Sequence, residues 1–131
     1  MSSDTEVYVK PEYERSDTTS RIIAAAIQVH RHLGPGFEEV IYQRALALEL
    51  QAQGIDFNRE VWMEIHYRGK VVGRKRVDFL IEGVMVEIKA CAELQDVHFV
   101  QALSYLKASG CKVGLLLNFG APRLEIKRLA N

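Results

Sequence analysis

The sequence predicts a single α/β (α+β) domain in which helices cover a mixed β-sheet. Three observations support this. A length of 131 residues allows one domain and not two. The apolar residues recur at helical spacing before residue 54 and alternate as in strands after residue 60. A nearly all-apolar run at residues 113–119 is typical of a strand buried on both faces. The predicted order of elements is ααβββαβ.

The first helix is predicted to follow an N-terminal arm. Residues 1–16 show no periodicity and are expected to be flexible, so the domain proper is predicted to span residues 17–131. Asp17 or Thr18 is the expected N-cap. Apolar residues at helical spacing continue to Leu33, where a Gly-Pro pair ends the helix.

The remaining elements follow from the same pattern. The second helix is predicted to begin near Phe37 or Glu38 and to end at about Gln53. Strands are predicted at residues 61–67, 71–81, 84–89 and 113–119, a short edge strand at 124–129, and a helix at 95–109. Turns are expected at Arg68-Gly69-Lys70 and at Glu82-Gly83.

Composition excludes several classes of protein. Hydrophobic residues make up 48% of the chain and charged residues 26%, which excludes global disorder. No apolar run approaches the ~18 residues of a membrane span, and the N-terminus lacks the apolar segment of a secretion signal. Cys91 and Cys111 lack the spacing of a metal pair. We therefore expect a cytoplasmic protein with reduced thiols, in which these cysteines and Trp62 serve as packing residues.

The hairpin of residues 76–89 carries the candidate site. If Glu82-Gly83 is a two-residue turn, the numbers of each cross-strand pair sum to 165. One face is then wholly apolar and is expected to face the core, and it pairs Val77 with Ile88, Phe79 with Val86, and Ile81 with Val84. The other face pairs Leu80 with Met85, Asp78 with Glu87, and Arg76 with Lys89.

Two carboxylates directly opposite each other admit two interpretations. Cβ atoms in such a pair lie about 4.5–5.5 Å apart, so Asp78 and Glu87 repel unless a cation lies between them. Lys89 lies on the same face and could be that cation, which makes the group a structural salt-bridge cluster. Alternatively, the two carboxylates hold a divalent metal, with Lys89 beside the reacting atoms.

The order Asp78, then Glu87-Ile88-Lys89, resembles the Asp…(Asp/Glu)-x-Lys core of the PD-(D/E)XK nuclease superfamily. Residues 36–42, Gly-Phe-Glu-Glu-Val-Ile-Tyr, resemble the signature of the GxxExxY protein family. Residues 101–105, Gln-Ala-Leu-Ser-Tyr, resemble the Gln-x-x-x-Tyr motif of RecB-type nucleases. The resemblance covers roughly residues 18–129 and departs from the family pattern at Val77, where the proline of the family name is missing.

This resemblance implies a restriction-endonuclease-like core and a Mg²⁺- or Mn²⁺-dependent nuclease. Asp78 and Glu87 would hold the metal, with the Ile88 carbonyl as a further ligand and Glu39 as a third acidic group acting directly or through water. Lys89 would position the attacking water or stabilise the transition state. Gln101 and Tyr105 would orient a metal-bound water or a phosphate, and Tyr42 would orient Glu39. Helix geometry points Glu38 away from Glu39, toward the surface.

A basic segment predicts how nucleic acid would bind. The chain has no net charge, but residues 68–76 hold five basic side chains and no acid. Arg74, Lys75 and Arg76 are expected to hold the flanking strand by its phosphates, without reading bases. The alternative is a solvated hairpin edge. The surface of so small a chain is limited for a long duplex, so a homodimer or a partner protein would supply more.

Two other functions stay open from the sequence alone. One is a non-catalytic nucleic-acid-binding or protein-interaction module that retains the nuclease-like fold, because fold does not fix function. The other is a metal-dependent hydrolase of a different phosphate ester. DNA is the expected substrate, although no residue separates DNA from RNA.

Overall fold

The computed structural model describes residues 15–131. The N-terminal segment that was predicted to be flexible, residues 1–16, therefore lies almost wholly outside the described residues. Five strands form one sheet in the order β1-β2-β3-β4-β5, in which β3 and β4 are parallel and the other neighbours are antiparallel. The elements are α2 (Ser16–Leu33), α3 (Glu39–Ala52), β1 (Asn58–Tyr67), β2 (Lys70–Ile81), β3 (Val84–Lys89), α4 (Asp96–Ser109), β4 (Val113–Asn118) and β5 (Glu125–Ala130).

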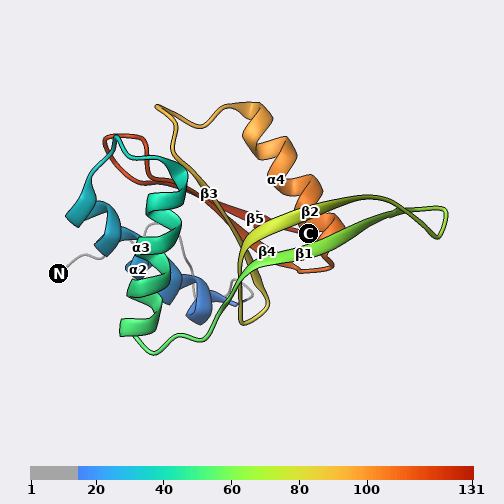
Figure 1. Ribbon diagram of the computed structural model, residues 1–131, viewed down its shortest axis with the longest axis horizontal. Helices are drawn as coiled ribbons and strands as arrows, with labels where there is room; N and C mark the ends of the chain where they lie inside the picture. The colour runs from blue at the N-terminus through green and yellow to red at the C-terminus, as the bar shows by residue number, and fades with distance from the viewer. Residues whose placement is uncertain (1–14) are drawn as a thin grey trace.

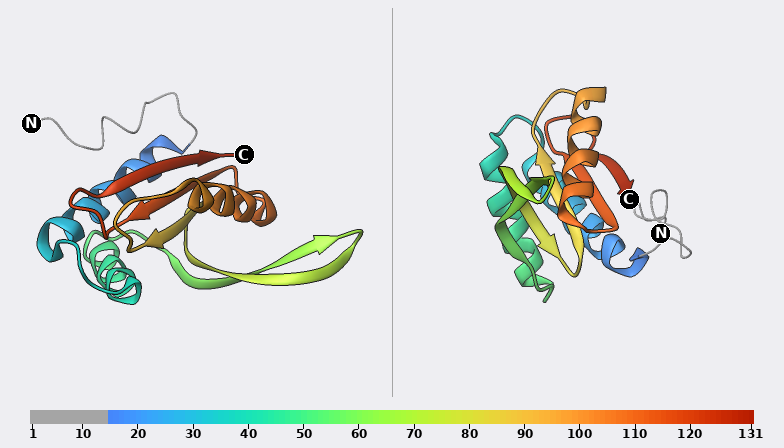
Figure 2. Two further views of the ribbon diagram at one scale, coloured as in Figure 1. Left: turned by 90° about the horizontal axis from the view of Figure 1, so that it is seen from above. Right: turned by 90° about the vertical axis from the view of Figure 1, so that its right-hand side faces the viewer.

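The sheet is the middle of three layers (Figures 1 and 2). Helices α2 and α3 cover one face, where side chains of β2, β3 and β4 complete the main core around Phe79, Val86 and Leu115. Helix α4 covers the other face, where Ala102 and Leu106 pack with Met85 and Leu116. The α/β architecture is thereby confirmed, and the separately predicted edge strand follows the order ααβββαβ as β5.

The predicted N-cap of the first helix is wrong. Arg15, with a left-handed φ of 61°, precedes the helix and makes no side-chain cap. Asp17 and Thr18 lie inside the first turn and use their side chains elsewhere. Asp17 pairs with Arg21, and the Thr18 hydroxyl donates to Glu82 in the β2–β3 turn. Asp17 thus pairs within the helix, and Thr18 fastens the helix to the sheet, so neither side chain caps it.

The predicted hairpin register is confirmed over three pairs, Phe79 with Val86, Leu80 with Met85, and Ile81 with Val84. Glu82 and Gly83 both have positive φ, as a two-residue hairpin turn requires. Val77 differs from the prediction, because it packs with Met85 under α4 and not with Phe79 on the α2–α3 face. The alternation breaks at Asp78, opposite the segment of β1 where Glu60 adopts a positive φ.

Strands β3 and β4 form the buried centre of the sheet. All residues of β4 are buried, as predicted for a strand covered on both faces. Glu87 is one of the few charged residues in this interior. Among residues 15–131, no helix is long and apolar enough to cross a membrane.

The segment that follows Lys89 is tied to the β4–β5 turn by one buried side chain. The Asn118 amide Nδ2 donates to the Cys91 carbonyl and to Glu125, and Asn118 Oδ1 accepts from the amides of Cys91 and Gly120. Gly120 passes so close that an added Cβ would lie 2.5 Å from the Cys91 nitrogen. The path of the chain after Lys89 therefore depends on glycine at position 120.

We expect Gly120→Ala to lower the free energy of unfolding by about 1–3 kcal/mol, because backbone atoms and not a flexible side chain occupy the space of the new methyl group. Urea denaturation measures the change. Gly73→Ala is the matched control, since no atom lies within 4 Å of its added Cβ and its φ is not positive. Equal stability of Gly120→Ala and wild type would contradict the role given to this contact.

Candidate active site

Asp78 and Glu87 lie where strands β2 and β3 separate. The backbone ladder between the strands ends at Phe79 and Val86, and we call the opening beyond this pair the fork. There the two carboxylates, in place of backbone carbonyls, accept hydrogen bonds from the backbone amides. The Asp78 amide donates to Glu87 Oε2 at 2.9 Å, and the Ile88 amide donates to Asp78 Oδ2 at 2.8 Å. The predicted proximity of the two acids is thus a reciprocal exchange of side-chain and backbone bonds.

The cation that pairs with Glu87 is Lys75, not Lys89 as the sequence suggested. Lys75 Nζ lies 3.4 Å from Glu87 Oε1 and 4.9 Å from the centre of the Tyr105 ring. Lys89 ends β3 half-buried and acts on Asp78 and Glu39 through its charge. Because Lys75 forms the salt bridge with the buried carboxylate of Glu87, Lys89 is not part of that salt bridge.

Helix α3 supplies two polar groups to the fork. Gln43 Nε2 donates to Asp78 Oδ1 at 2.9 Å. Glu39, four residues earlier, shares that face of the helix and stands in its first turn. The charges that act on Glu39 come from Lys89, Asp78, Lys75 and His98. These residues belong to both strands of the fork and to α4, so charged groups from three elements act on this side chain of α3. The contact of Gln43 was not predicted, although its place one turn after Glu39 was a usable signal.

Burial raises the pKa values of all three acids, and the charge of Asp78 adds to the rise at Glu87 and Glu39. Burial raises the pKa of Glu87 to about 7, and the charge of Asp78 adds to the rise, whereas the Asp78 amide and Lys75 oppose it. Burial also raises the pKa of Asp78, against the Ile88 amide and Lys75. For Glu39, burial raises the pKa and Lys89 lowers it. The fork therefore concentrates negative charge that a cation would stabilise.

The donor chemistry of the fork fits Mg²⁺ or Mn²⁺, which bind through one or two carboxylates and waters. Each of the four carboxylate oxygens of Asp78 and Glu87 already has a protein partner. A metal would replace Gln43 at Asp78 Oδ1 and Lys75 at Glu87 Oε1, since the other two oxygens accept backbone amides. Within residues 15–131, no three His, Cys, Asp or Glu side chains are grouped closely enough to hold a metal, so Glu39 does not complete a three-acid cluster.

Tyr42, which was expected to orient Glu39, holds the preceding loop instead. Its hydroxyl donates to the Gly34 carbonyl at 2.6 Å and accepts from the Phe37 amide at 3.1 Å. The ring is buried and stacks on Phe119 at 5.0 Å. Gly36, with φ of 114°, makes the turn between these anchors. This part of the motif therefore fixes where α3 begins, and with it the position of Glu39.

Helix α4 brings Tyr105 to the site through Lys75, which lies over its ring. Gln101, one turn earlier, is exposed. His98 Nδ1 accepts from the Gln95 amide in a capping box, and its charge acts on Glu39. His98 is not among the predicted site residues, although its position three residues before Gln101 placed it on a neighbouring face.

The predicted basic rim divides between the two faces of β2. Lys75 points to Glu87, whereas Arg74 and Arg76 pair with acids of β1, Glu64 and Glu60, each at 3.7 Å. Arg76 also lies over the Trp62 ring. The expectation that Arg76 faces Lys89 is wrong, because the β2–β3 ladder extends only from Ile81 back to Phe79 and does not reach Arg76. Trp62 is not a packing residue either, since it is 64% exposed.

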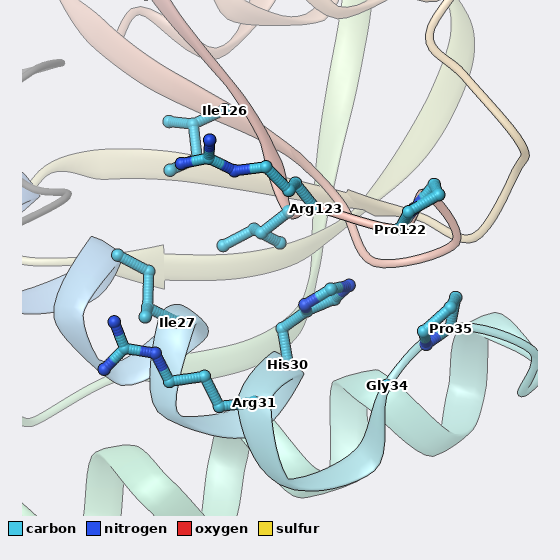
Figure 3. A pocket seen from close by; sticks show the side chains of 9 residues that line it. Ile27, His30, Arg31, Gly34, Pro35, Pro122, Arg123 and Ile126 are labelled. Atoms are coloured by element: carbon cyan, nitrogen blue, oxygen red, sulfur yellow. The ribbon is translucent and has the colours of Figure 1, made fainter.

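A separate hollow of about 350 Å³ lies at the C-terminal end of α2 (Figure 3). His30 Nε2 bonds with the Ala121 carbonyl at its back, and Arg31 and Arg123 reach it from α2 and the β4–β5 connection. No carboxylate lines it. The hollow is therefore distinct from the fork.

A mixed sheet between helical layers, with two acids and a lysine at the fork, defines a restriction-endonuclease-like core. The model of the PD-(D/E)XK nuclease superfamily matches residues 16–129, and the chain belongs to that superfamily. No curated protein sequence matches the chain.

Among solved structures, the chain is similar to the crystal structure of SSO0001, with a TM-score of 0.57 and 23% sequence identity. The similarity covers 70% of this chain and 48% of SSO0001, so the chain spans about half the length of that protein. At this identity, the similarity shows a common fold.

The raised pKa of Glu87 predicts an unusual pH dependence of stability. The folded protein binds this proton more tightly than the unfolded chain, whose ordinary glutamate pKa is 4.5. This contribution is complete below pH 4.5 and is lost as the pH rises through about 7, at a cost of up to about 3 kcal/mol. Urea denaturation in EDTA should therefore show that the free energy of unfolding declines between pH 5 and pH 8. The Glu87→Gln substitution should reduce that decline.

Glu93→Gln is the control, since Glu93 is exposed and lies outside the fork. It should keep the wild-type decline. The same pH profile for Glu87→Gln and wild type would show that Glu87 is already ionised at pH 5.

Proposed function

We propose that this protein is a divalent-metal-dependent nuclease that hydrolyses phosphodiester bonds in DNA. The observation that carries the proposal is the reciprocal bonding of Asp78 and Glu87 at the fork, with Lys89 at the end of the same strand as Glu87. Membership of the nuclease superfamily supports it. The Gly36, Glu39 and Tyr42 spacing further supports placement in the GxxExxY group, and Gln101 with Tyr105 supports the RecB-type motif.

Asp78 and Glu87 would hold Mg²⁺ or Mn²⁺, with the Ile88 carbonyl as an additional ligand and Glu39 acting through water. The metal, when bound, would polarise the scissile phosphate and lower the pKa of a bound water. Lys89 would orient the attacking water and stabilise negative charge on the phosphate. Gln101 and Tyr105 would orient water or a backbone phosphate. In this function Lys75, which pairs with Glu87 in the structure, would contact a substrate phosphate.

A non-catalytic binding module is the second candidate, and one observation favours it. Because Gln43, Lys75 and two backbone amides already satisfy the carboxylate oxygens, the fork is complete without a metal. In a module of this kind, Lys75 would be a permanent partner of Glu87. The two candidates differ in whether metal binds at the fork, which can be measured without any substrate.

Metal binding should raise the melting temperature of the wild-type protein by mass action when Mn²⁺ or Mg²⁺ is added. Asp78→Asn should remove that rise, because it removes one carboxylate. Thermal melts across a metal titration measure the effect, and Asp96→Asn, at the exposed start of α4, is the control. No metal-dependent shift in the wild type would favour the binding module.

Lys89→Ala should lower divalent-dependent cleavage of DNA by at least about 100-fold, because it removes a group that stabilises developing charge. Its melting temperature should stay near the wild-type value, since Lys89 is only half-buried and Lys75, not Lys89, forms the ion pair with Glu87. The matched control is Lys107→Ala in the last turn of α4, which should cleave normally. Unfolding of the variant, or cleavage at the wild-type rate, contradicts the catalytic role. RNA of the same sequence, assayed in parallel, tests the choice of DNA.

The division of the basic rim gives a salt-dependent prediction. Arg74→Gln with Arg76→Gln should weaken nucleic-acid binding uniformly across sequences and reduce the slope of log K against log salt, by about 0.7–0.9 for each phosphate that the variant no longer neutralises. Binding in EDTA across a salt series measures the slope. Arg74 and Arg76 pair with Glu64 and Glu60 and not with Asp78 or Glu87, so the metal-dependent rise in melting temperature should persist. An unchanged slope would make these arginines a solvated edge.

A further inference from the structure

Strands β1 and β2 extend beyond the helical layers as a projecting hairpin (Figure 2). We call residues 59–76 the arm, with its tip at the turn of Arg68 and Gly69. Large apolar side chains are exposed along it: Trp62 is 64% exposed, Tyr67 is 67% exposed and Val72 is 64% exposed. Since exposed apolar surface of this kind marks interaction sites, the arm presents a contact surface.

The arm is the most basic part of a chain without net charge. Residues 59–76 hold six basic and two acidic side chains, and the acids are the partners of Arg74 and Arg76. Exposed ion pairs at 3.7 Å contribute little to stability, so a phosphate could replace Glu60 or Glu64. Arg76 already lies 5.8 Å from the centre of the Trp62 ring. A cation of the arm therefore already lies beside its exposed aromatic ring.

A hollow of about 580 Å³ lies beside Trp62, between the arm and the end of α4. Trp62, His66 and the Glu64–Arg74 ion pair line it from the arm, and Ala108 and Ser109 line it from α4. Helix α4 connects the hollow with the fork, because Ala108 follows Tyr105, whose ring lies under Lys75, by about one helical turn. A nucleic-acid strand that runs from the fork along α4 would therefore reach the hollow.

We propose that the arm binds single-stranded nucleic acid as it leaves the fork, with unpaired bases stacked on Trp62 and phosphates held by Arg74 and Arg76. This inference rests on the proposed nuclease function. Exposed aromatic rings favour a single strand, because every unpaired base offers a face for stacking. A duplex, whose bases stack on each other, would contact the arm only through its phosphates.

Trp62 is the single tryptophan of the sequence, so its fluorescence reports on the arm alone. We expect an oligothymidylate of about twelve nucleotides, added in EDTA to prevent cleavage, to quench this fluorescence as it binds. In anisotropy titrations with the same labelled oligonucleotide, Trp62→Ala should weaken binding by about 5- to 100-fold. Binding of a duplex of equal length should not depend on Trp62.

Leu48→Ala is the matched control, because Leu48 is 67% exposed on α3, away from the arm, and should bind like wild type. Absence of quenching with unchanged affinity of Trp62→Ala overturns the inference. An equal loss of affinity for duplex overturns the preference for single strands. If sedimentation shows a wild-type dimer that Trp62→Ala dissociates, the arm is instead a contact between copies of the chain.

The two proposals fail in different ways. Normal quenching by a protein that never cleaves with Mg²⁺ or Mn²⁺ would overturn the nuclease and leave the single-strand site. Cleavage by a protein whose fluorescence and affinity are insensitive to Trp62 would overturn the arm and leave the nuclease.

Discussion

The site depends on one exchange of hydrogen bonds, in which Asp78 and Glu87 each accept a backbone amide from the other strand of the fork. Two acids this close repel, and burial makes their charge still less favourable. The amides of Asp78 and Ile88 offset part of that cost, and the charge of Lys75 offsets a further, smaller part. Because the acids replace the ladder bonds at this point, the strands can separate without leaving buried amides unpaired. The opening of the sheet and the position of the acids therefore have one cause.

The layers around the fork bring distant segments of sequence to it. Helix α3 adds Gln43 and Glu39, and its start is fixed by Tyr42, which binds the loop before it and stacks on Phe119 after β4. Helix α4 adds Tyr105 beneath Lys75. The motif residues thus do two kinds of work: some carry charge to the fork, and Tyr42 positions the elements that carry it.

Much of the fold could be predicted because its signals are local. The two-residue turn and strict alternation fixed the pairing of Phe79 with Val86, and the apolar run marked β4 as buried. Alternation could not predict Val77, since it assigns Val77 and Phe79 to one face, whereas Val77 packs under α4 and Phe79 packs on the α2–α3 face. The partner of Glu87 was missed for the same reason, because Lys75 shares a face with Val77, and alternation places that face toward the core and away from Glu87. Gln43 carried no signal beyond its spacing from Glu39.

The β2–β3 turn has a consequence for how the geometry of the fork is maintained. Glu82 is held by the Thr18 hydroxyl and by Arg21, so α2 fastens the turn to the body of the protein. Asp78 and Glu87 are only nine positions apart, and the turn alone determines which residues meet. One inserted residue there would move Asp78 out of line with Glu87 while leaving both side chains in the sequence. The length of the two-residue turn thus determines whether Asp78 and Glu87 meet, although the turn lies at the opposite end of the hairpin from these two side chains.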